Sequence, residues 1–428
     1  MSVGQIRGDK VIWRESNQLR GQSMFGRFVK NIYGMILRHL YARRTRLTHT
    51  SSNPESILLI RTDAIGDYVL FTPALRYIRR SFPNSRIALV VNKNLVDLVS
   101  PCPFVDEVIP LDVRRYRRNC FYRLSFIRDL RQRAFHSVIH PTHSRTLESD
   151  EIAYCSGAAQ KVGIYGDLSN ISAHEREKNN AYYTRLLKTD ETNMSEIERN
   201  RDFAAQVTGA PIESADFQPE LWLTESDRAA AKKLLEEAGF DPTRDLIAAI
   251  LPGAAWKGRE WPVISYAKVA DRIVNQYGVK IVILGSPADV NVATSVASGM
   301  RSPSSNLAGK TGLRELAAIL ESCGFYIGNE TGPLHLAVAM GIPTLCIIGG
   351  GHLGRFYPYG DLNRHRMVYK KMECFNCNWK CIHESIRCIQ EITVEDVWSH
   401  TQRMVEEVVI PEREHRSKKR FNGVTLSR

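Results

Sequence analysis

The sequence contains no long apolar run. No segment of its 428 residues reaches the roughly 20 apolar residues that a membrane-spanning helix needs. Its N-terminus also lacks the continuous apolar stretch of a signal peptide. We therefore expect a cytoplasmic protein. In that reducing compartment its nine cysteines are not expected to form a disulfide framework.

Other features are missing as well. The sequence shows no internal repeat of short period and no recognised nucleic-acid-binding module, so a nucleic-acid partner is not expected. Its net charge of +12 nevertheless implies an anionic partner, such as an acidic glycan or lipid phosphate. The apolar fraction of 43% is ordinary for a globular protein, and the length suits two domains with tails.

The positive charge is concentrated near the two ends of the chain. Residues 1–52 form a basic arm with few acids, and residues 412–428 form a basic tail. Within the arm, residues 24–40 show helical periodicity, with apolar residues on one face and Arg and Lys elsewhere. Such a helix suits the surface of an anionic membrane. A helix packed on the body of the protein, or a frayed arm, would show the same pattern.

Between the ends, short apolar runs alternate with helical patterns. This alternation predicts an α/β protein with two doubly wound, Rossmann-like units and a ligand in the cleft between them. We place the units at 53–215 and 216–390, followed by a helix at 391–411 that crosses back to the first unit. The predicted strands are 57–60, 86–91, 105–109, 137–140 and 161–163, then 246–251, 281–284, 325–327 and 344–348.

Residues 328–335, Gly-Asn-Glu-Thr-Gly-Pro-Leu-His, follow one of these strands and precede a helical pattern. Pro333 suits the first turn of a helix, where its missing N–H is not needed, and Gly332 lets a ligand approach the backbone. The N–H groups at a helix N-terminus favour an anion, especially a phosphate. This segment therefore predicts a phosphate-binding turn.

A second turn, residues 61–67, follows the first predicted strand. Asp67 lies where this turn becomes a helix, and two interpretations remain open for it. Its carboxylate is either a helix cap or a general base at the carboxyl end of a strand, where open α/β sheets place their active sites.

Four cysteines lie close together near the end of the second unit. They are Cys374, Cys377, Cys381 and Cys388, with spacings x2, x3 and x6. In a reducing compartment this cluster indicates a tetrahedral metal site that holds a loop in place, and zinc is the first expectation. His383 is a substitute ligand. Disulfides or free thiols are the alternative.

Four segments, in this order along the chain, resemble the bacterial heptosyltransferase family, glycosyltransferase family 9, whose members include ADP-heptose:lipopolysaccharide heptosyltransferases. The segments are 61–67, 252–262 with its Pro-Gly-Ala and Trp-Pro, 307–311 and 328–337. The resemblance implies a GT-B fold. It also implies inverting transfer of heptose or a related sugar from a nucleotide donor to lipopolysaccharide or another cell-surface glycan, without a catalytic metal. An epimerase-like GT-B enzyme and a non-catalytic polyanion-binding protein remain alternatives.

The resemblance also implies roles for individual residues. Asp67 matches the base that deprotonates the acceptor. Glu330 stands where the family usually has Asp, which moves the carboxylate by one methylene near the donor sugar. Some relatives that modify proteins hold iron with clustered cysteines, so iron is an alternative to zinc. The expected donor contacts are Lys257, Arg259, Glu330, Thr331, Gly332, Pro333 and His335, and the expected acceptor contacts are Arg61, Asp63, His140 and His143.

Overall fold

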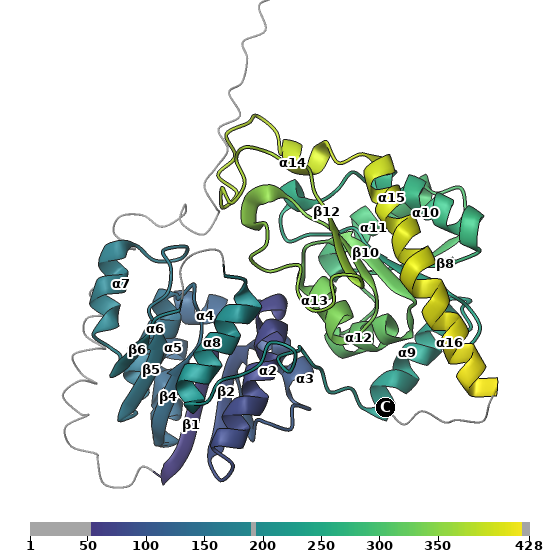
Figure 1. The fold of residues 1–428 in the computed structure, drawn as a ribbon. Helices are drawn as coiled ribbons and strands as arrows, with labels where there is room; N and C mark the ends of the chain where they lie inside the picture. Colours follow the sequence, from purple (N-terminus) through teal and green to yellow (C-terminus); the bar gives the residue numbers. More distant parts are fainter. Residues whose placement is uncertain (1–52, 190–193, 422–428) are drawn as a thin grey trace, which may run out of the picture.

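The computed structural model describes residues 53–189 and 194–421, which form two parallel six-stranded sheets flanked by helices (Figure 1). The first sheet has the order β3-β2-β1-β4-β5-β6, and the second has the order β12-β11-β10-β7-β8-β9. Counted from the first strand of each unit, both orders are 3-2-1-4-5-6, the doubly wound Rossmann order. The predicted fold class is thereby confirmed.

The first unit contains the following strands and helices: β1 (Asn53–Arg61), α2 (Ile65–Ser81), β2 (Arg86–Asn92), α3 (Val96–Val99), β3 (Glu107–Leu111), α4 (Val113–Arg118), α5 (Cys120–Gln132), β4 (Phe135–His140), α6 (Leu147–Cys155), β5 (Gln160–Ile164), α7 (Ala173–Asn180), β6 (Arg185–Leu187) and α8 (Glu196–Thr208).

The second unit contains α9 (Glu225–Glu237), β7 (Ile247–Leu251), the 3-10 turn η2 (Lys257–Arg259), α10 (Val263–Tyr277), β8 (Lys280–Ile283), α11 (Val290–Gly299), β9 (Ser304–Asn306), α12 (Leu313–Ser322), β10 (Phe325–Asn329), α13 (Gly332–Ala339), β11 (Thr344–Ile347), the 3-10 turn η4 (Gly350–His352), β12 (His365–Val368), α14 (Arg387–Gln390), α15 (Val394–Met404) and α16 (Ile410–Phe421).

Both faces of the central strands β1 and β7 are buried, which explains the uninterrupted apolar runs 57–60 and 247–251. In β1, Ile57 and Leu59 belong to one apolar core, whereas Leu58 and Ile60 belong to another on the opposite face. A strand covered by helices on both sides needs apolar side chains at every position. Each predicted strand overlaps one in the structure, and the short strands β6, β9 and β12 were not predicted.

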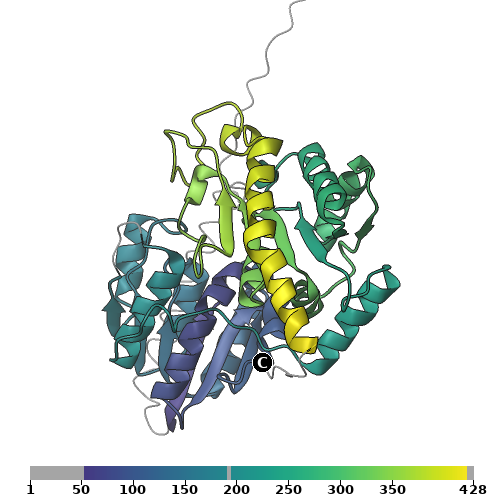
Figure 2. The same cartoon turned by 45° about the vertical axis from the view of Figure 1, so that its right-hand side comes forward.

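The two units share an apolar core, so they are packed against each other. Helix α2 of the first unit lies against α13 of the second, and α3 lies against α12. Tyr68 and Phe71 of α2 belong to the same core as Leu334 and Leu336 of α13. Figure 2 shows this junction from the side on which α15 and α16 come forward. The contact brings the N-terminal ends of α2 and α13 together.

The C-terminal helices run as one continuous rod through a π-helical turn at Val405–Val409. Helix α15 packs on α10, β11 and β12 of the second unit (Figures 1 and 2). These contacts lie on the second unit, so the crossing back of residues 391–411 stays a prediction. The predicted basic tail begins inside α16, whose backbone is helical up to Phe421.

Two predictions concern the membrane. The basic arm at 1–52 lies outside the described residues, so its amphipathic helix stays a prediction. Within 53–189 and 194–421, no helix combines the length and the apolar character that crossing a bilayer requires.

Candidate active site

The loop between β1 and α2 is held from within by Arg61. This side chain is fully buried. Its Nη2 donates to the backbone oxygen of Asp67 at 2.9 Å, and its Nε lies 3.1 Å from Oδ1 of Asp63. Its guanidinium also stacks over Phe71, 5.2 Å from the ring centre. Arg61 therefore shapes the loop. Because it has no exposed surface, its predicted acceptor contact is not supported in this structure.

Asp67 caps helix α2, which is one of the two interpretations of its position. Its catalytic role stays a prediction. It is the third residue of α2, and its Oδ2 accepts the N–H of Ala64 at 3.2 Å. Burial raises the pKa of the Asp67 carboxyl. The charge of Arg61 opposes this shift, and that of Glu196 adds to it. A carboxylate with a raised pKa is a stronger base than an ordinary aspartate.

Asp63 is the second carboxylate of this loop, and its side chain is 21% exposed. Burial raises its pKa to about 7, the charge of Arg61 opposes the shift, and the charge of Asp67 adds to it. Two interacting carboxylates thus lie at the carboxyl end of β1. Asp63 remains placed to contact a hydroxyl group of an acceptor.

The turn between β10 and α13 has the predicted strand–turn–helix form. Strand β10 ends at Asn329, Thr331 is the N-cap residue of α13, and Pro333 lies in the first turn. The Thr331 side chain makes no capping hydrogen bond. Pro333 has no N–H, and the N–H of Leu334 donates to the oxygen of Thr331 at 3.1 Å. The N–H of Gly332 at the helix start is therefore left for another acceptor, such as a phosphate.

The two turns face each other across the junction of the units. A Cβ atom added to Gly66 would lie 2.5 Å from Cδ2 of His335, and one added to Gly332 would lie 2.8 Å from Cβ of Ile65. Neither glycine has room for a side chain. The predicted base and the predicted phosphate-binding turn therefore lie next to each other at this junction, although they are more than 250 residues apart in the sequence.

Asn329 connects the second turn to the Trp-Pro segment. Its Oδ1 accepts the N–H of Trp261 at 3.2 Å and the hydroxyl of Tyr266 at 3.0 Å, and its Nδ2 donates to the oxygen of Pro252 at 2.6 Å. One buried amide thus joins the carboxyl ends of β7 and β10, the switch point of this sheet.

Arg259 lies at this switch point and binds Glu330. Its Nη2 donates to the backbone oxygen of Glu330 at 2.6 Å and also contacts the Glu330 carboxylate. Burial raises the pKa of Glu330, and the charge of Arg259 opposes this shift. Lys257 is exposed on η2. Arg259 therefore stands beside the start of α13, where a diphosphate ligand is expected, and Lys257 lies two residues before it in the chain.

His335 is one of the expected donor contacts, and that role stays a prediction. It is buried, its Nδ1 is 2.9 Å from the hydroxyl of Tyr359, and the two rings stack. Burial lowers the pKa of His335 to about 3, and the charge of Arg259 adds to this. The imidazole is therefore neutral at physiological pH, and it packs against Gly66 rather than supplying positive charge.

The two predicted acceptor histidines lie in different environments. His140 is completely buried, and its Nδ1 is 2.6 Å from the hydroxyl of Tyr183. It therefore cannot touch an acceptor in this structure. His143 is 6% exposed and lines a cavity of about 340 Å³ at the carboxyl ends of β5 and β6. The other lining residues are Tyr165, Gly166, Lys188 and Thr189.

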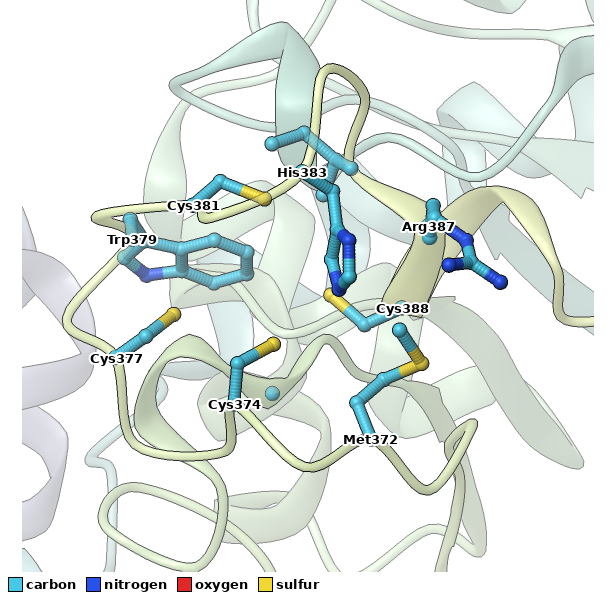
Figure 3. Close-up of a pocket in the computed structure, with 10 residues that line it drawn as sticks. Met372, Cys374, Cys377, Trp379, Cys381, His383, Arg387 and Cys388 are labelled. Carbon is cyan, nitrogen blue, oxygen red and sulfur yellow. The ribbon is translucent and has the colours of Figure 1, made fainter.

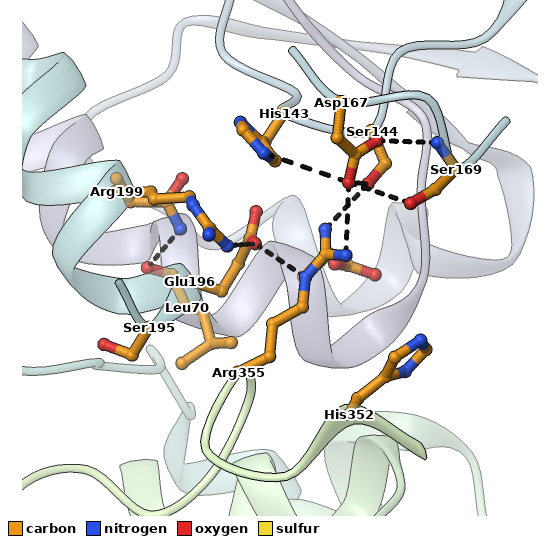
Figure 4. A network of polar contacts seen from close by, with 12 residues as sticks. Leu70, His143, Ser144, Asp167, Ser169, Ser195, Glu196, Arg199, His352 and Arg355 are labelled. Atoms are coloured by element: carbon orange, nitrogen blue, oxygen red, sulfur yellow. Dashed lines mark hydrogen bonds and ion pairs between the residues drawn. The ribbon is translucent and has the colours of Figure 1, made fainter. Parts of the chain in front are cut away.

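Arg355 joins the two units and was not identified from the sequence. It extends from the loop after η4 into the first unit (Figure 4). Its Nη2 donates to Oγ of Ser144 at 2.7 Å, its Nη1 is 3.2 Å from Asp167, and its Nε is 3.4 Å from Glu196. Its backbone oxygen accepts the N–H of Glu196 at 2.6 Å. No motif or periodicity marks this arginine.

The charge of Arg355 acts on the carboxylates around it. The pKa of Asp167 is lowered in this network. Burial alone would raise it, but the N–H of Ser169 and the charge of Arg355 outweigh burial. The same guanidinium acts against the rise of the Asp67 and Glu330 pKa values. The charge of Arg355 therefore acts on carboxylates of both units at their junction.

The four clustered cysteines line one small cavity in the second unit (Figure 3). The cavity measures about 10 Å³, and His383 and Met372 complete its wall. Burial raises the pKa of Cys388, and the charges of the other three cysteines add to it, so the sulfurs are close. In the described part of the chain, however, no three His, Cys, Asp or Glu side chains are arranged to hold a metal ion. The predicted metal is therefore not supported by this arrangement of side chains, and none of the four cysteines forms a disulfide.

Known proteins resemble this chain in sequence and in fold. The lipopolysaccharide core heptosyltransferase OpsX of Haemophilus influenzae is 22% identical over 320 residues, which cover 74% of this chain and 86% of that protein. The family 9 glycosyl transferase of Veillonella parvula superposes with a TM-score of 0.71 at 20% identity, covering 84% of this chain and 99% of that one.

A third similar protein is the Escherichia coli heptosyltransferase WaaC, solved with ADP-2-deoxy-2-fluoro heptose. It has a TM-score of 0.55 and 20% identity, covering 76% of this chain and 98% of that one. The expected GT-B architecture is thus confirmed. The model of glycosyltransferase family 9 (heptosyltransferase) matches residues 123–383, which is more than half of the sequence. The chain therefore belongs to glycosyltransferase family 9, the heptosyltransferase family, and is a glycosyltransferase that uses a nucleotide-sugar donor.

Proposed function

We propose that this enzyme moves heptose or a closely related sugar from an ADP-linked donor to lipopolysaccharide or another anionic cell-surface glycan, with inversion at the anomeric carbon. The observation that carries the proposal is the close packing of the 61–67 loop on the start of α13 at Gly66 and Gly332. This packing supports a role for Asp67 as a base beside a helix terminus that suits a phosphate.

In this mechanism Asp67 accepts the proton of the acceptor hydroxyl as the oxygen attacks the anomeric carbon. The bond from that carbon to the diphosphate breaks, and the nucleoside diphosphate departs on the opposite face. The N–H groups of Thr331 and Gly332, in the turn that Pro333 closes, and the cations Lys257 and Arg259 stabilise its developing charge. Glu330, held by Arg259, lies where the donor sugar is expected.

The acceptor side is formed by Asp63 and the cavity beside His143. Lys188 and Tyr165 line this cavity, and the Lys188 ammonium lies 5.9 Å from the Tyr165 ring centre. A cation beside an aromatic ring suits a sugar that carries an acidic group. The donor of WaaC and the lipopolysaccharide acceptor of OpsX are the nearest chemical precedents.

The substitution Asp67→Asn tests the proposal. The variant keeps a side chain of the same size but cannot accept the proton, so turnover should fall by about 10³-fold while ADP binding is retained. Release of ADP from ADP-heptose, with deacylated lipopolysaccharide core as acceptor, measures turnover. Asp129→Asn, at an exposed position on α5, is the matched control. Unchanged turnover in the Asp67 variant would refute the assignment.

The donor sugar needs its own test, because Glu330 replaces the aspartate usual in the family. Thermal-shift measurements with ADP-heptose, ADP-glucose, GDP-mannose and UDP-glucose should show the largest stabilisation with ADP-heptose. A larger stabilisation by a sugar linked to another base would reassign the donor.

We further propose that Cys374, Cys377, Cys381 and Cys388 hold a structural zinc, with iron as the alternative. The support is chemical: four thiols border one cavity, and thiolates are preferred ligands of both metals. Ligation requires the side chains to turn toward the cavity centre. Metal analysis after purification without chelator should find about one ion per chain, lost in Cys374→Ser/Cys377→Ser and kept in Cys120→Ser. Less metal in the native protein, with all thiols reactive, would contradict this site.

Finally, we propose that the basic arm at 1–52 attaches the enzyme to the inner face of the cytoplasmic membrane, where a glycolipid acceptor would lie. Full-length protein should sediment with vesicles containing anionic lipid and not with neutral vesicles. Replacing Arg27, Lys30 and Arg38 by Glu should abolish this binding, whereas equal binding to both kinds of vesicle would exclude an electrostatic attachment.

A further inference from the structure

The cysteine-rich loop, defined here as residues 372–388, is attached to the turn η4 through its backbone. The N–H of Asn376 donates to the oxygen of Gly350 at 2.6 Å, and that of Asn378 donates to the oxygen of Gly351 at 3.0 Å. Asn376, Asn378 and Trp379 have φ angles of 60°, 50° and 59°. Asparagine adopts this left-handed conformation readily, whereas a bulky residue such as Trp379 does so only where surrounding contacts hold it. One side chain of the loop is therefore held by its surroundings.

That side chain is the indole of Trp379. It lies directly on two glycines, because a Cβ atom at Gly349 would come within 2.7 Å of the ring and one at Gly351 within 2.4 Å. Trp256 contacts it edge-on, with ring centres 5.5 Å apart. The absence of side chains at Gly349 and Gly351 thus creates the seat in which the indole is held.

Arg259 is another neighbour of Trp379. The guanidinium carbon of Arg259 lies 5.3 Å from the Trp379 ring centre, within the range of a cation–π contact. The same guanidinium binds the backbone and the carboxylate of Glu330. Arg259 is therefore held between an aromatic ring and a carboxylate. A flexible arginine fixed in this way loses less conformational freedom when it binds an anion.

We propose that Trp379 is a positioning residue for the donor: it holds Arg259 in place for the diphosphate, and the cysteine-rich loop exists to hold Trp379. The inference rests on the proposed function, since it assigns to Arg259 the role of a diphosphate ligand. It gives the cysteine cluster a function in catalysis even though the cluster contacts no substrate.

The test compares ADP binding and donor kinetics in variants of the full-length protein. Trp379→Leu should raise the ADP dissociation constant and the donor KM by about tenfold, with kcat changed far less. Trp379→Phe keeps an aromatic face and should recover most of the loss. Trp398→Leu is the matched control, because Trp398 stacks on Arg272 on the outer helix α15, at 5.8 Å.

A double-mutant cycle separates positioning from general loosening of the fold. If Trp379 acts through Arg259, Trp379→Leu should add little further loss in an Arg259→Ala background. Full additivity, or unchanged ADP affinity in Trp379→Leu, would overturn the inference. Should Trp379→Leu unfold, Trp379→Met, which also removes the aromatic face, gives the same cycle in both backgrounds. A wild-type protein that does not bind ADP would instead refute the proposed function.

Discussion

At the scale of single residues, the central observation is that the proposed base, Asp67, is also a helix cap. Its capping bond to Ala64 fixes the carboxylate at the junction of the two units, and burial makes the carboxylate a stronger base. The two interpretations of the sequence were therefore not exclusive. A cap orients the same oxygen atoms that a base needs, at no additional cost in side-chain entropy.

The pH dependence of activity follows from the direction of this shift. The base must be ionised to act, so activity should fall as the pH falls through the raised pKa of Asp67. Glu196 contributes to the rise of that pKa. Glu196→Gln should therefore move the acid limb of kcat/KM to lower pH, by about half a unit to one unit.

A profile of log kcat/KM between pH 4 and 9 measures this displacement, with Asp129→Asn as the control. An acid limb that stays in place, or that moves to higher pH, would show that Glu196 does not act on the base. A purely structural effect of the substitution would lower the whole curve without displacing it.

At the scale of elements, the site depends on how closely the starts of α2 and α13 approach. Gly66 and His335 lie in contact there, as do Gly332 and Ile65. Neither glycine has a positive φ, so the backbone conformation does not require glycine at these positions. The close approach of the two helices does.

Replacing Gly66 by Ala tests this contact. The added methyl group would lie 2.5 Å from the His335 ring, so the two helices must separate. A displacement of about 1 Å should lower kcat/KM by roughly 100-fold. Gly312→Ala is the control, because its added Cβ would find its nearest neighbour at 3.7 Å and its φ is −74°.

Donor transfer and thermal stability should be measured together for both variants. The expected outcome is a folded Gly66→Ala protein with little transferase activity and a Gly312→Ala protein similar to the wild type. Full activity in Gly66→Ala would mean that catalysis does not depend on the contact between the two turns.

At the scale of the whole molecule, Arg355 determines how the two units are held together. Its guanidinium interacts with Ser144, Asp167 and Glu196 of the first unit, although it belongs to the second. The side chain is 20% exposed, so solvent weakens these ion pairs without removing them. Separation of the two units would break these contacts with Ser144, Asp167 and Glu196 together.

Arg355→Ala should therefore shift the enzyme toward an open state. We expect about 1–2 kcal/mol less stabilisation of the closed arrangement, or about a tenfold change in the open-to-closed ratio. Small-angle scattering without ligand should show a larger radius of gyration, and the donor KM should rise. Arg228→Ala is the control, because Arg228 pairs with Glu321 within the second unit. Identical scattering from wild type and Arg355→Ala would exclude this role.

Some features of the chain followed from local sequence. The apolar runs in β1 and β7 predicted buried parallel strands, because a buried strand is recorded in neighbouring residues. The strands β6, β9 and β12 were missed. They have only three or four residues and lie toward or at the sheet edges, where no continuous apolar run is needed.

The sequence alone thus determined two Rossmann-like units, the phosphate-binding turn and the candidate base, since each depends on residues adjacent in the chain. Only the tertiary structure decided that Arg61 and His140 are enclosed, that His335 is neutral and packs on Gly66, and that Arg355 meets Glu196 and Asp167. These outcomes depend on contacts between residues far apart in the chain. Burial and charge at such contacts are set by packing between units, which no local periodicity records.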